Sequence, residues 1–347
     1  MSHPAYHRSA PRPAARGEVA GRGPAGEGSG AALDTRAAVE DAARRGLLRA
    51  RNKSLPAWLL YDDAGSALFE EITRLPEYYL TRTEREILRR DAGAMIDAAG
   101  AGAPLELVEL GAGSASKTRL LIEAGLARQP RLRYVPVDVS RAALAQARAA
   151  LRDVRGLEVR PVAARYPDQL GFLRHDGDTR RLVVFLGSNI GNYDGRAAHQ
   201  LLSGVRRHLR SGDALLVGAD RRKSPAILLP AYDDAAGVTA RFSKNLLLRL
   251  NRDLGADFSP SLFHHVVRWN GRASRVELYL ESAAAQRVTL PALGATLDLQ
   301  ARERLHVESS YKRTDAAMRR VLTRAGFRPE RAWTDARRWF GLTLARV

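Results

Sequence analysis

The sequence predicts an α/β fold, with an open parallel sheet and a second, smaller α+β region. Strand-like apolar runs alternate with helical patterns from residue 105 to residue 217, as is typical of parallel sheets. The first run leads into Gly111 and Gly113 and then into a helix, an order found in the nucleotide-binding half of such sheets. After Asp220 the pattern changes to helical residues followed by three separate β-like runs. We therefore expect an insertion that lies outside the parallel sheet.

The first 35 residues differ in composition from the rest of the chain. They are rich in Pro, Ala, Gly and Arg and have almost no large apolar side chain after Tyr6. Such a segment cannot bury enough apolar surface to offset the entropy lost on ordering. We predict that residues 1–35 form a disordered tail.

Three helices are predicted before the first strand. They cover residues 35–51, residues 64–74 and a segment that ends near residue 99. Pro76 is expected to stop the second helix, because the residue before a proline disfavours helical backbone. Thr83 and Glu86 have the spacing of a capping box, which predicts the start of the third helix at this point.

Four apolar runs are expected to form the parallel strands: residues 105–108, 133–138, 182–186 and 214–217. The following region is predicted to hold a helix at residues 226–254 and β-like runs at residues 264–269, 275–280 and 286–290. A helix at residues 314–325 then ends at Gly326, since glycine is common just after a helix C-terminus. Two last runs, around residues 331–333 and 339–345, are expected to complete a seven-stranded sheet as an edge pair.

The glycine turn favours one class of cofactor. Lys117 and Thr118 lack the preceding glycine of a Walker loop, and the third glycine of a dinucleotide fingerprint is missing. Gly111 and Gly113 still let the backbone approach a ligand closely. Glu109, just before the glycines, suits a cofactor that carries an ammonium group. The turn therefore indicates S-adenosylmethionine.

Two further strand ends carry polar residues. Asp138 ends the second run, where a carboxylate typically accepts hydrogen bonds from ribose hydroxyls. Asp138 is also suited to cap the helix that begins after Ser140, and both roles are compatible. Residues 187–193 follow the third run with two glycines and two asparagines. They are expected at the carboxyl edge of the sheet, where ligands bind in such folds.

Composition excludes several classes of function. The 347 residues suffice for one large or two ordinary domains, and the absence of cysteine excludes disulfides, thiolate metal sites and cysteine nucleophiles. The net charge of +18 comes mostly from arginines spread over the helices, which disfavours a nucleic-acid-binding protein. No apolar run approaches the length of a membrane span, and the N-terminus lacks the apolar core of a secretory signal. We expect a cytoplasmic monomer with no bound metal ion.

Motifs along most of the chain resemble one known family. They lie, in order, at residues 61–84, 109–114, 187–192, 231–240, 245–258 and 306–312. Together they resemble the L-histidine Nα-methyltransferases of ergothioneine biosynthesis. The resemblance implies a Rossmann-like, seven-stranded class I methyltransferase domain at residues 83–222 and 313–347. It also implies a second α+β domain, for substrate binding, at residues 36–82 and 223–312.

The resemblance implies roles for individual residues. Asn192 and Tyr232 would hold the substrate carboxylate, with Tyr61 and Asn192 as the catalytic pair. The substrate contacts would come from eight residues: Phe69, Tyr78, Gly187, Asn189, Asn192, Tyr232, Glu308 and Ser310. Tyr78, Glu308 and Ser310 among them would hold an imidazole, while Gly187 and Asn189 would lie beside the amino group. Tyr61 and Phe69 would line the methyl-transfer cavity. The cofactor would be bound by Glu109, Gly111, Gly113, Lys117, Asp138 and Tyr166.

The chain departs from the family pattern at three places. Ala164 and Arg165 stand where the family usually has Gly-Asp, so the carboxylate expected at the adenine amino group is absent. Asn189 replaces the usual threonine, and Leu278 stands where a methionine often lines the imidazole pocket. We expect methylation of the α-amine of L-histidine to the trimethylated product hercynine. The alternatives are Nα-methylation of another, aromatic amino acid and, less favoured, a basic nucleic-acid-binding protein on a degenerate methyltransferase fold.

Overall fold

A computed structural model describes residues 36–49, 51–165, 170–173 and 179–347. The predicted tail at residues 1–35 and the predicted cofactor residue Tyr166 lie outside these ranges. Within them, no helix combines the length and the apolar character needed to cross a bilayer.

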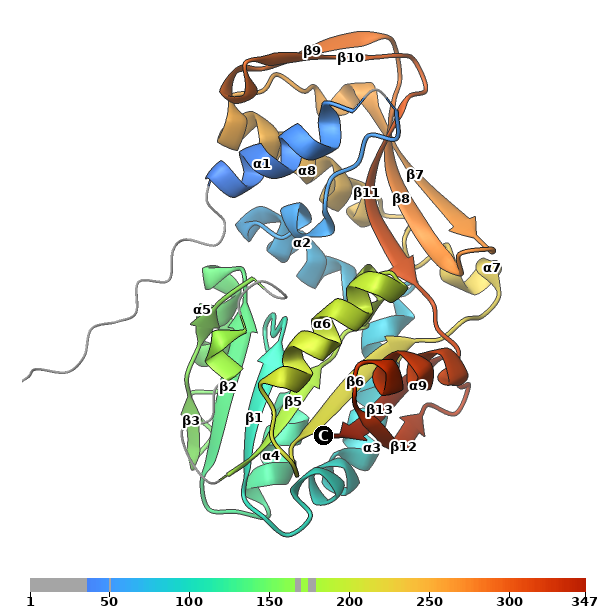
Figure 1. Cartoon of the computed structure of the whole chain (residues 1–347). Coiled ribbons are helices and arrows are strands. Elements are labelled where there is room, and N and C mark those ends of the chain that lie inside the picture. The colour runs from blue at the N-terminus through green and yellow to red at the C-terminus, as the bar shows by residue number, and fades with distance from the viewer. Residues whose placement is uncertain (1–35, 50, 166–169, 174–178) are drawn as a thin grey trace, which may run out of the picture. The chain divides into compact units, whose positions relative to one another are not determined.

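The main sheet has the expected parallel core with an antiparallel edge (Figure 1). Its strands are β1 (Leu105–Leu110), β2 (Leu132–Asp138), β3 (Leu157–Val159), β4 (Val162–Ala163), β5 (Arg180–Phe185), β6 (Ala214–Asp220), β12 (Arg328–Thr334) and β13 (Phe340–Arg346). The order is β12-β13-β6-β5-β1-β2-β3, and β13 runs antiparallel to both neighbours. Eight strands stand where seven were predicted, because β3 and β4 both pair with β2. Pro161 lies between these two short strands and has no N–H group to continue the ladder.

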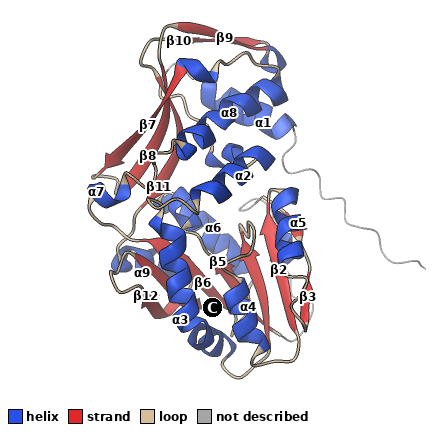
Figure 2. Cartoon of the chain, turned by 180° about the vertical axis from the view of Figure 1, so that it is seen from behind, coloured by secondary structure: helices blue, strands red, loops and turns tan. Residues whose placement is uncertain are grey.

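Helices cover both faces of the sheet, so its strands are apolar on both sides (Figures 1 and 2). One face packs against α3 (Tyr79–Gly100), α4 (Arg119–Leu126) and α5 (Arg141–Ala150). The other packs against α6 (Gly195–Arg207) and α9 (Asp315–Arg324). Adjacent residues of a strand therefore pack into the hydrophobic cores on opposite faces of the sheet, as Leu107 and Val108 do. This arrangement leaves the carboxyl edge of the strands open for a site.

The N-terminal helices and the late insertion pack together at that edge. Both α1 (Arg36–Leu47) and α2 (Asp63–Ile72) contact α8 (Val238–Leu254). An antiparallel sheet joins β11 (Arg304–Tyr311), β8 (Arg275–Ser282) and β7 (Phe263–Asn270), and β9 (Gln286–Leu290) pairs with β10 (Ala295–Leu299). By their contacts, Ala32–Val347 form one compact unit, so the division into two domains stays a prediction.

Two predicted helices were wrong in detail, and two strands of the insertion were not predicted. The third helix begins at Tyr79, and Thr83 lies inside it, where its hydroxyl donates to the Tyr79 carbonyl, so there is no capping box. The single helix predicted at residues 226–254 is two, α7 (Pro225–Leu228) and α8, separated by a turn in which Gly237 has a positive φ of 67°. Two strands of the insertion, β10 and β11, were missed as elements of the fold.

Candidate active site

The glycine turn after β1 is held against β2. Gly111 and Gly113 have positive φ values of 71° and 51°, a conformation that glycine adopts without strain. The Gly111 N–H donates to the carbonyl of Val137 at 2.8 Å, and the Gly113 N–H donates to Asp138 Oδ2 at 3.0 Å. Asp138 Oδ1 accepts from the N–H of Ser140, and Ser140 itself caps α5. The turn is thus fixed before any ligand binds.

Glu109 lies behind the turn as a buried carboxyl group. Its two oxygens accept hydrogen bonds from Thr118 Oγ1 at 2.6 Å and from Tyr134 Oη at 2.5 Å. Burial raises the pKa of Glu109 to about 7. The Glu109 carboxyl therefore joins β1, β2 and the start of α4 on one wall of the site.

A buried carboxylate that was not predicted as a site residue links the two sides of the site. Glu84, on α3, accepts the Lys117 ammonium at 2.5 Å and the Gly187 N–H at 2.9 and 3.0 Å. Lys117 belongs to the glycine turn and Gly187 to the loop after β5. The sequence gives one sign of this role: Glu84 lies four residues from both Leu80 and Leu88, and so falls on the apolar face of the helix.

The loop after β5 makes a tight turn that brings its amides to the site. Ser188 has a φ of 58°, and its Oγ accepts the N–H of Asp220 at the end of β6. The residues Asn189–Asn192 then form a 3₁₀ turn, η3. Both Asn189 and Asn192 line the site cavity.

Aromatic rings form one wall of the site. Tyr61 and Phe69 meet edge to face at 5.5 Å, Phe69 and Tyr78 at 6.1 Å, and Tyr78 and Tyr232 at 6.3 Å. Burial raises the pKa of Tyr61, Tyr78 and Tyr232 well above 10, and the neighbouring Glu308 carboxyl adds to each shift. These phenols therefore stay protonated at neutral pH.

Glu308 is a nearly buried carboxyl group that faces this wall. It lies on β11 just after a register shift against β8, and such bulges re-aim side chains. Only 8% of Glu308 is exposed, and burial raises its pKa to about 7 although the charge of Lys312 opposes the shift. Among the described residues, no side chain or backbone N–H donates a hydrogen bond to its carboxyl group. Glu308 is therefore free to pair with a ligand.

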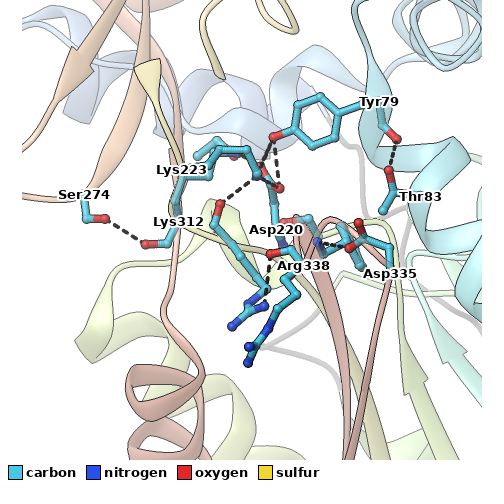
Figure 3. Close-up of polar contacts among 12 residues, drawn as sticks. Tyr79, Thr83, Asp220, Lys223, Ser274, Lys312, Asp335 and Arg338 are labelled. Atoms are coloured by element: carbon cyan, nitrogen blue, oxygen red, sulfur yellow. Dashed lines mark hydrogen bonds and ion pairs between the residues drawn. The ribbon is translucent and has the colours of Figure 1, made fainter. Parts of the chain in front are cut away.

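A buried ionic network around Asp220, Lys223 and Lys312 (Figure 3) contacts Tyr232 and Ser310 through Lys312. The Lys312 ammonium donates to Tyr232 Oη at 2.6 Å, to Ser310 Oγ at 2.8 Å and to Asp220 Oδ2 at 2.9 Å. Asp220 also accepts from Lys223 at 2.5 Å and from Tyr79 at 2.8 Å. Asp220 and both lysines were not predicted as site residues. Lys223 lies only three residues from Asp220, whereas Lys312 and Tyr79 come from distant parts of the chain.

The structure brings the described members of the predicted set, except Tyr232 and Ser310, around one cavity of about 780 Å³. Its lining includes Tyr61, Phe69, Tyr78, Glu109, Gly111, Gly113, Lys117, Asp138, Gly187, Asn189, Asn192 and Glu308. Tyr232 and Ser310 line a smaller pocket that shares Tyr61, Phe69, Tyr78, Gly187, Asn189, Asn192 and Glu308 with it. Leu278 also lines the smaller pocket. Arg165 lines the large cavity, where its guanidinium lies 5.3 Å from the centre of the Trp58 ring.

Comparison with known proteins gives one family and several relatives. A family model described as histidine-specific, SAM-dependent methyltransferase matches residues 39–347. The chain is 44% identical over 299 residues to the histidine N-alpha-methyltransferase of Mycolicibacterium smegmatis, which covers 86% of this chain and 92% of that protein. It is 27% identical over 282 residues to ergothioneine biosynthesis protein 1 of Schizosaccharomyces pombe, 79% of this chain and 36% of that protein. It is 26% identical over 311 residues to the 4-dimethylallyltryptophan N-methyltransferase of Epichloe festucae var. lolii, and the match covers 83% of this chain and 89% of that protein.

Proposed function

Because the chain belongs to the family of histidine-specific, S-adenosylmethionine-dependent methyltransferases, we propose that it methylates the α-amine of L-histidine. The product would be the trimethylated betaine hercynine, and the reaction the first step of ergothioneine biosynthesis. The observation that carries this proposal is the Glu308 carboxyl group, which is 8% exposed, lines the pocket and accepts no hydrogen bond from the described residues. An imidazole N–H would donate to it and satisfy the otherwise unpaired carboxyl group.

The residues of the glycine turn fit S-adenosylmethionine. A Cβ atom at Gly113 would meet no atom closer than 4.0 Å, so the turn borders open space. The Asp138 carboxyl group accepts the N–H groups of Gly113 and Ser140 and keeps lone pairs for a ribose hydroxyl. Lys117 gives one N–H to Glu84 and keeps others for an anionic group. When bound, the cofactor supplies an electrophilic methyl group; Glu109, Gly111, Gly113, Lys117 and Asp138 would hold it.

The substrate would lie along the aromatic wall. Asn192 and Tyr232 would hold its carboxylate, and Tyr78, Glu308 and Ser310 its imidazole, while Gly187 and Asn189 would lie beside the amine. Because burial keeps Tyr61 protonated, we propose that Tyr61 and Asn192 orient the amine and do not remove its proton. The faces of Tyr61 and Phe69 suit a nitrogen that becomes a permanent cation. Orientation of this kind supplies a large part of the rate enhancement in group transfer.

Nα-methylation of another aromatic amino acid is the second candidate. It is favoured by Asn189 and Leu278, which line the smaller pocket, and by the similarity to a methyltransferase whose name contains a tryptophan derivative. An indole offers a single N–H and no acceptor nitrogen, so it would use the Glu308 carboxyl less well. Arg165 lines the cavity and stacks on Trp58, so it does not support the alternative of a nucleic-acid-binding protein.

The test is methyl transfer to single amino acids, with the products weighed by mass spectrometry. Incubation with S-adenosylmethionine and L-histidine should add three methyl groups. No gain in mass on histidine would refute the proposal. With equal concentrations of histidine and tryptophan, a preference for tryptophan would favour the second candidate. Gel-shift titration at two salt concentrations tests nucleic-acid binding, because specific binding survives physiological salt with a steep salt dependence.

We also propose that the enzyme works as a cytoplasmic monomer. The support is that the predicted site residues which the structure describes line the cavity and the smaller pocket of a single chain, and that both proposed substrates are small molecules. Light scattering behind a sizing column measures the mass of the particle, and a dimer would contradict this proposal.

A further inference from the structure

Two lysines share one buried aspartate beside the smaller pocket (Figure 3). Asp220 ends β6, and its carboxylate lies 2.5 Å from the Lys223 ammonium and 2.9 Å from the Lys312 ammonium. The side chains of Asp220 and Lys312 are fully buried, and that of Lys223 is 7% exposed. One carboxylate thus faces both ammonium groups; burial lowers the pKa of each lysine, while Asp220 favours its charged form. In a buried environment such a charge acts more strongly than in water.

All three protons of the Lys312 ammonium have acceptors. They go to Asp220, to Tyr232 Oη and to Ser310 Oγ. The two hydroxyl oxygens lie 2.8 Å apart, so one of them donates its proton to the other. One hydroxyl proton of the pair then remains, and the structure shows no acceptor for it among the described residues. Because both residues line the smaller pocket, that proton is available to a ligand there.

The second lysine has a different role. Lys223 donates to Asp220, to Tyr79 Oη and to the carbonyl of Arg221, and it lines neither the large cavity nor the smaller pocket. The two lysines therefore have the same charge, the same carboxylate partner and similar burial. Only Lys312 touches residues of the pocket.

We propose that Lys312 is a positioning residue that makes the corner of the pocket at the Tyr232 hydroxyl selective for a free carboxylate, while Ser310, hydrogen-bonded to Tyr232, stays beside the proposed imidazole. Its ammonium occupies an acceptor site on each hydroxyl, so the corner presents a donor proton, and its charge favours an anion over a neutral group. The enzyme should therefore discriminate free amino acids from their amides. This inference rests on the proposed function, since it takes an amino acid to be the occupant of the pocket.

The experiment compares the binding of L-histidine and L-histidinamide by calorimetry, with S-adenosylhomocysteine present so that no transfer occurs. The quantity of interest is the ratio of the two Kd values in the full-length enzyme and in Lys312→Met. A charge-assisted hydrogen bond corresponds to about a tenfold to hundredfold change in affinity, so the ratio should fall by at least about tenfold in this variant. Differences between the two ligands themselves cancel when the ratio is compared across variants.

Lys223→Met is the matched control. It removes the other ammonium but leaves Lys312 on Asp220, so the ratio should stay at the wild-type value. In Lys312→Met, Asp220 keeps Lys223 and Tyr79 as partners, and the affinity for S-adenosylhomocysteine should not change. A ratio that falls equally in both lysine variants would overturn the inference, because any loss of charge would then suffice.

Other outcomes decide the inference as well. An unchanged ratio in a Lys312→Met protein that unfolds cooperatively overturns it. If that variant does not fold, Lys312→Gln keeps an N–H donor without the charge, and the same criterion applies to it. An unchanged ratio in Tyr232→Phe overturns the inference whatever the lysine variants show. If wild-type enzyme binds another amino acid instead of histidine, the proposed function fails, and the ratio for that amino acid and its amide still tests Lys312.

Discussion

Replacing Glu308 by glutamine should have opposite effects on binding and on stability. Glu308→Gln keeps the shape of the side chain and removes its charge. The lost interaction is a charge-assisted hydrogen bond to an imidazole N–H, worth about 1.5–3 kcal/mol. The affinity for L-histidine should therefore fall about tenfold to a hundredfold. The affinity for S-adenosylhomocysteine should not change, because Glu308 belongs to the substrate end of the cavity.

The stability of the ligand-free protein should change in the other direction. The pKa of Glu308 is about 7 in the folded chain and about 4.5 when it is exposed. Between these pH values the Glu308 carboxyl is ionised in the unfolded chain but protonated in the folded chain. The free energy of unfolding therefore falls as the pH rises from about 4.5 to about 7. A difference of about 2.5 in pKa corresponds to about 3 kcal/mol above pH 7, as an upper limit. Glu308→Gln should be more stable than wild type by up to that amount at pH 8, and equal to it near pH 4.5.

Urea unfolding at pH 5 and at pH 8 measures the stability, and calorimetry measures the binding. Glu277→Gln on the neighbouring strand β8 is the matched control, since Glu277 is also buried. Burial alone would raise the pKa of Glu277, but hydrogen bonds from Asn270, Tyr279 and Arg275 lower it. Glu277→Gln should therefore lose stability at pH 8 and bind histidine normally. Unchanged histidine affinity in Glu308→Gln, or no gain in its stability at pH 8, would refute the assignment of Glu308.

Three further perturbations test other parts of the site. Glu84→Gln removes the negative charge that pairs with Lys117. Calorimetry should show at least about fivefold weaker binding of both S-adenosylhomocysteine and L-histidine. Weaker binding of only one ligand would contradict the proposal that Glu84 links the two sides of the site. Gly187→Ala places a side chain at a φ of 72° and 3.1 Å from Lys117 Nζ, so urea unfolding should show a loss of about 1–2 kcal/mol; full stability would mean that the turn has relaxed. Deletion of Met1–Gly30, which lies outside the matched family region, should leave turnover and the thermal midpoint unchanged, and a several-fold loss of turnover would indicate that the tail covers the site.

The sequence was sufficient for the parts of the fold that depend on local pattern. The order of strand, glycine turn and helix around Gly111 could be predicted because apolar periodicity and glycine conformations are local properties. The start of α3 could not, because the burial of Tyr79 against Asp220, 141 residues away, extends the helix beyond the apparent cap at Thr83. Long-range contact prevailed over local propensity there, as it commonly does.

The candidate site divides in the same way. Motif resemblance located Glu308, whereas its free carboxyl group became visible only in the structure. Glu84 and Lys312 were missed because their roles depend on partners distant in the sequence, such as Lys117 for Glu84 and Tyr232 for Lys312. A charged residue among apolar ones marks such positions without naming the partner. Pairing, burial and pKa shifts follow only once the chain is folded.

One segment of the chain contributes to binding both the imidazole and the carboxylate of the proposed substrate. Side chains two residues apart on a strand point to the same face, so Glu308, Ser310 and Lys312 follow one another along the same side of β11 and its end. The register shift before Glu308 starts this series, since His306 instead packs against Tyr279. Two residues of strand span about 6.6 Å, which is on the scale of one amino acid. A single strand can therefore present Glu308 and Ser310 to an imidazole and, through Lys312 and its hydrogen bond to Tyr232, a cationic corner to a carboxylate. Methylation changes neither of those substrate groups, so the same contacts serve each successive transfer.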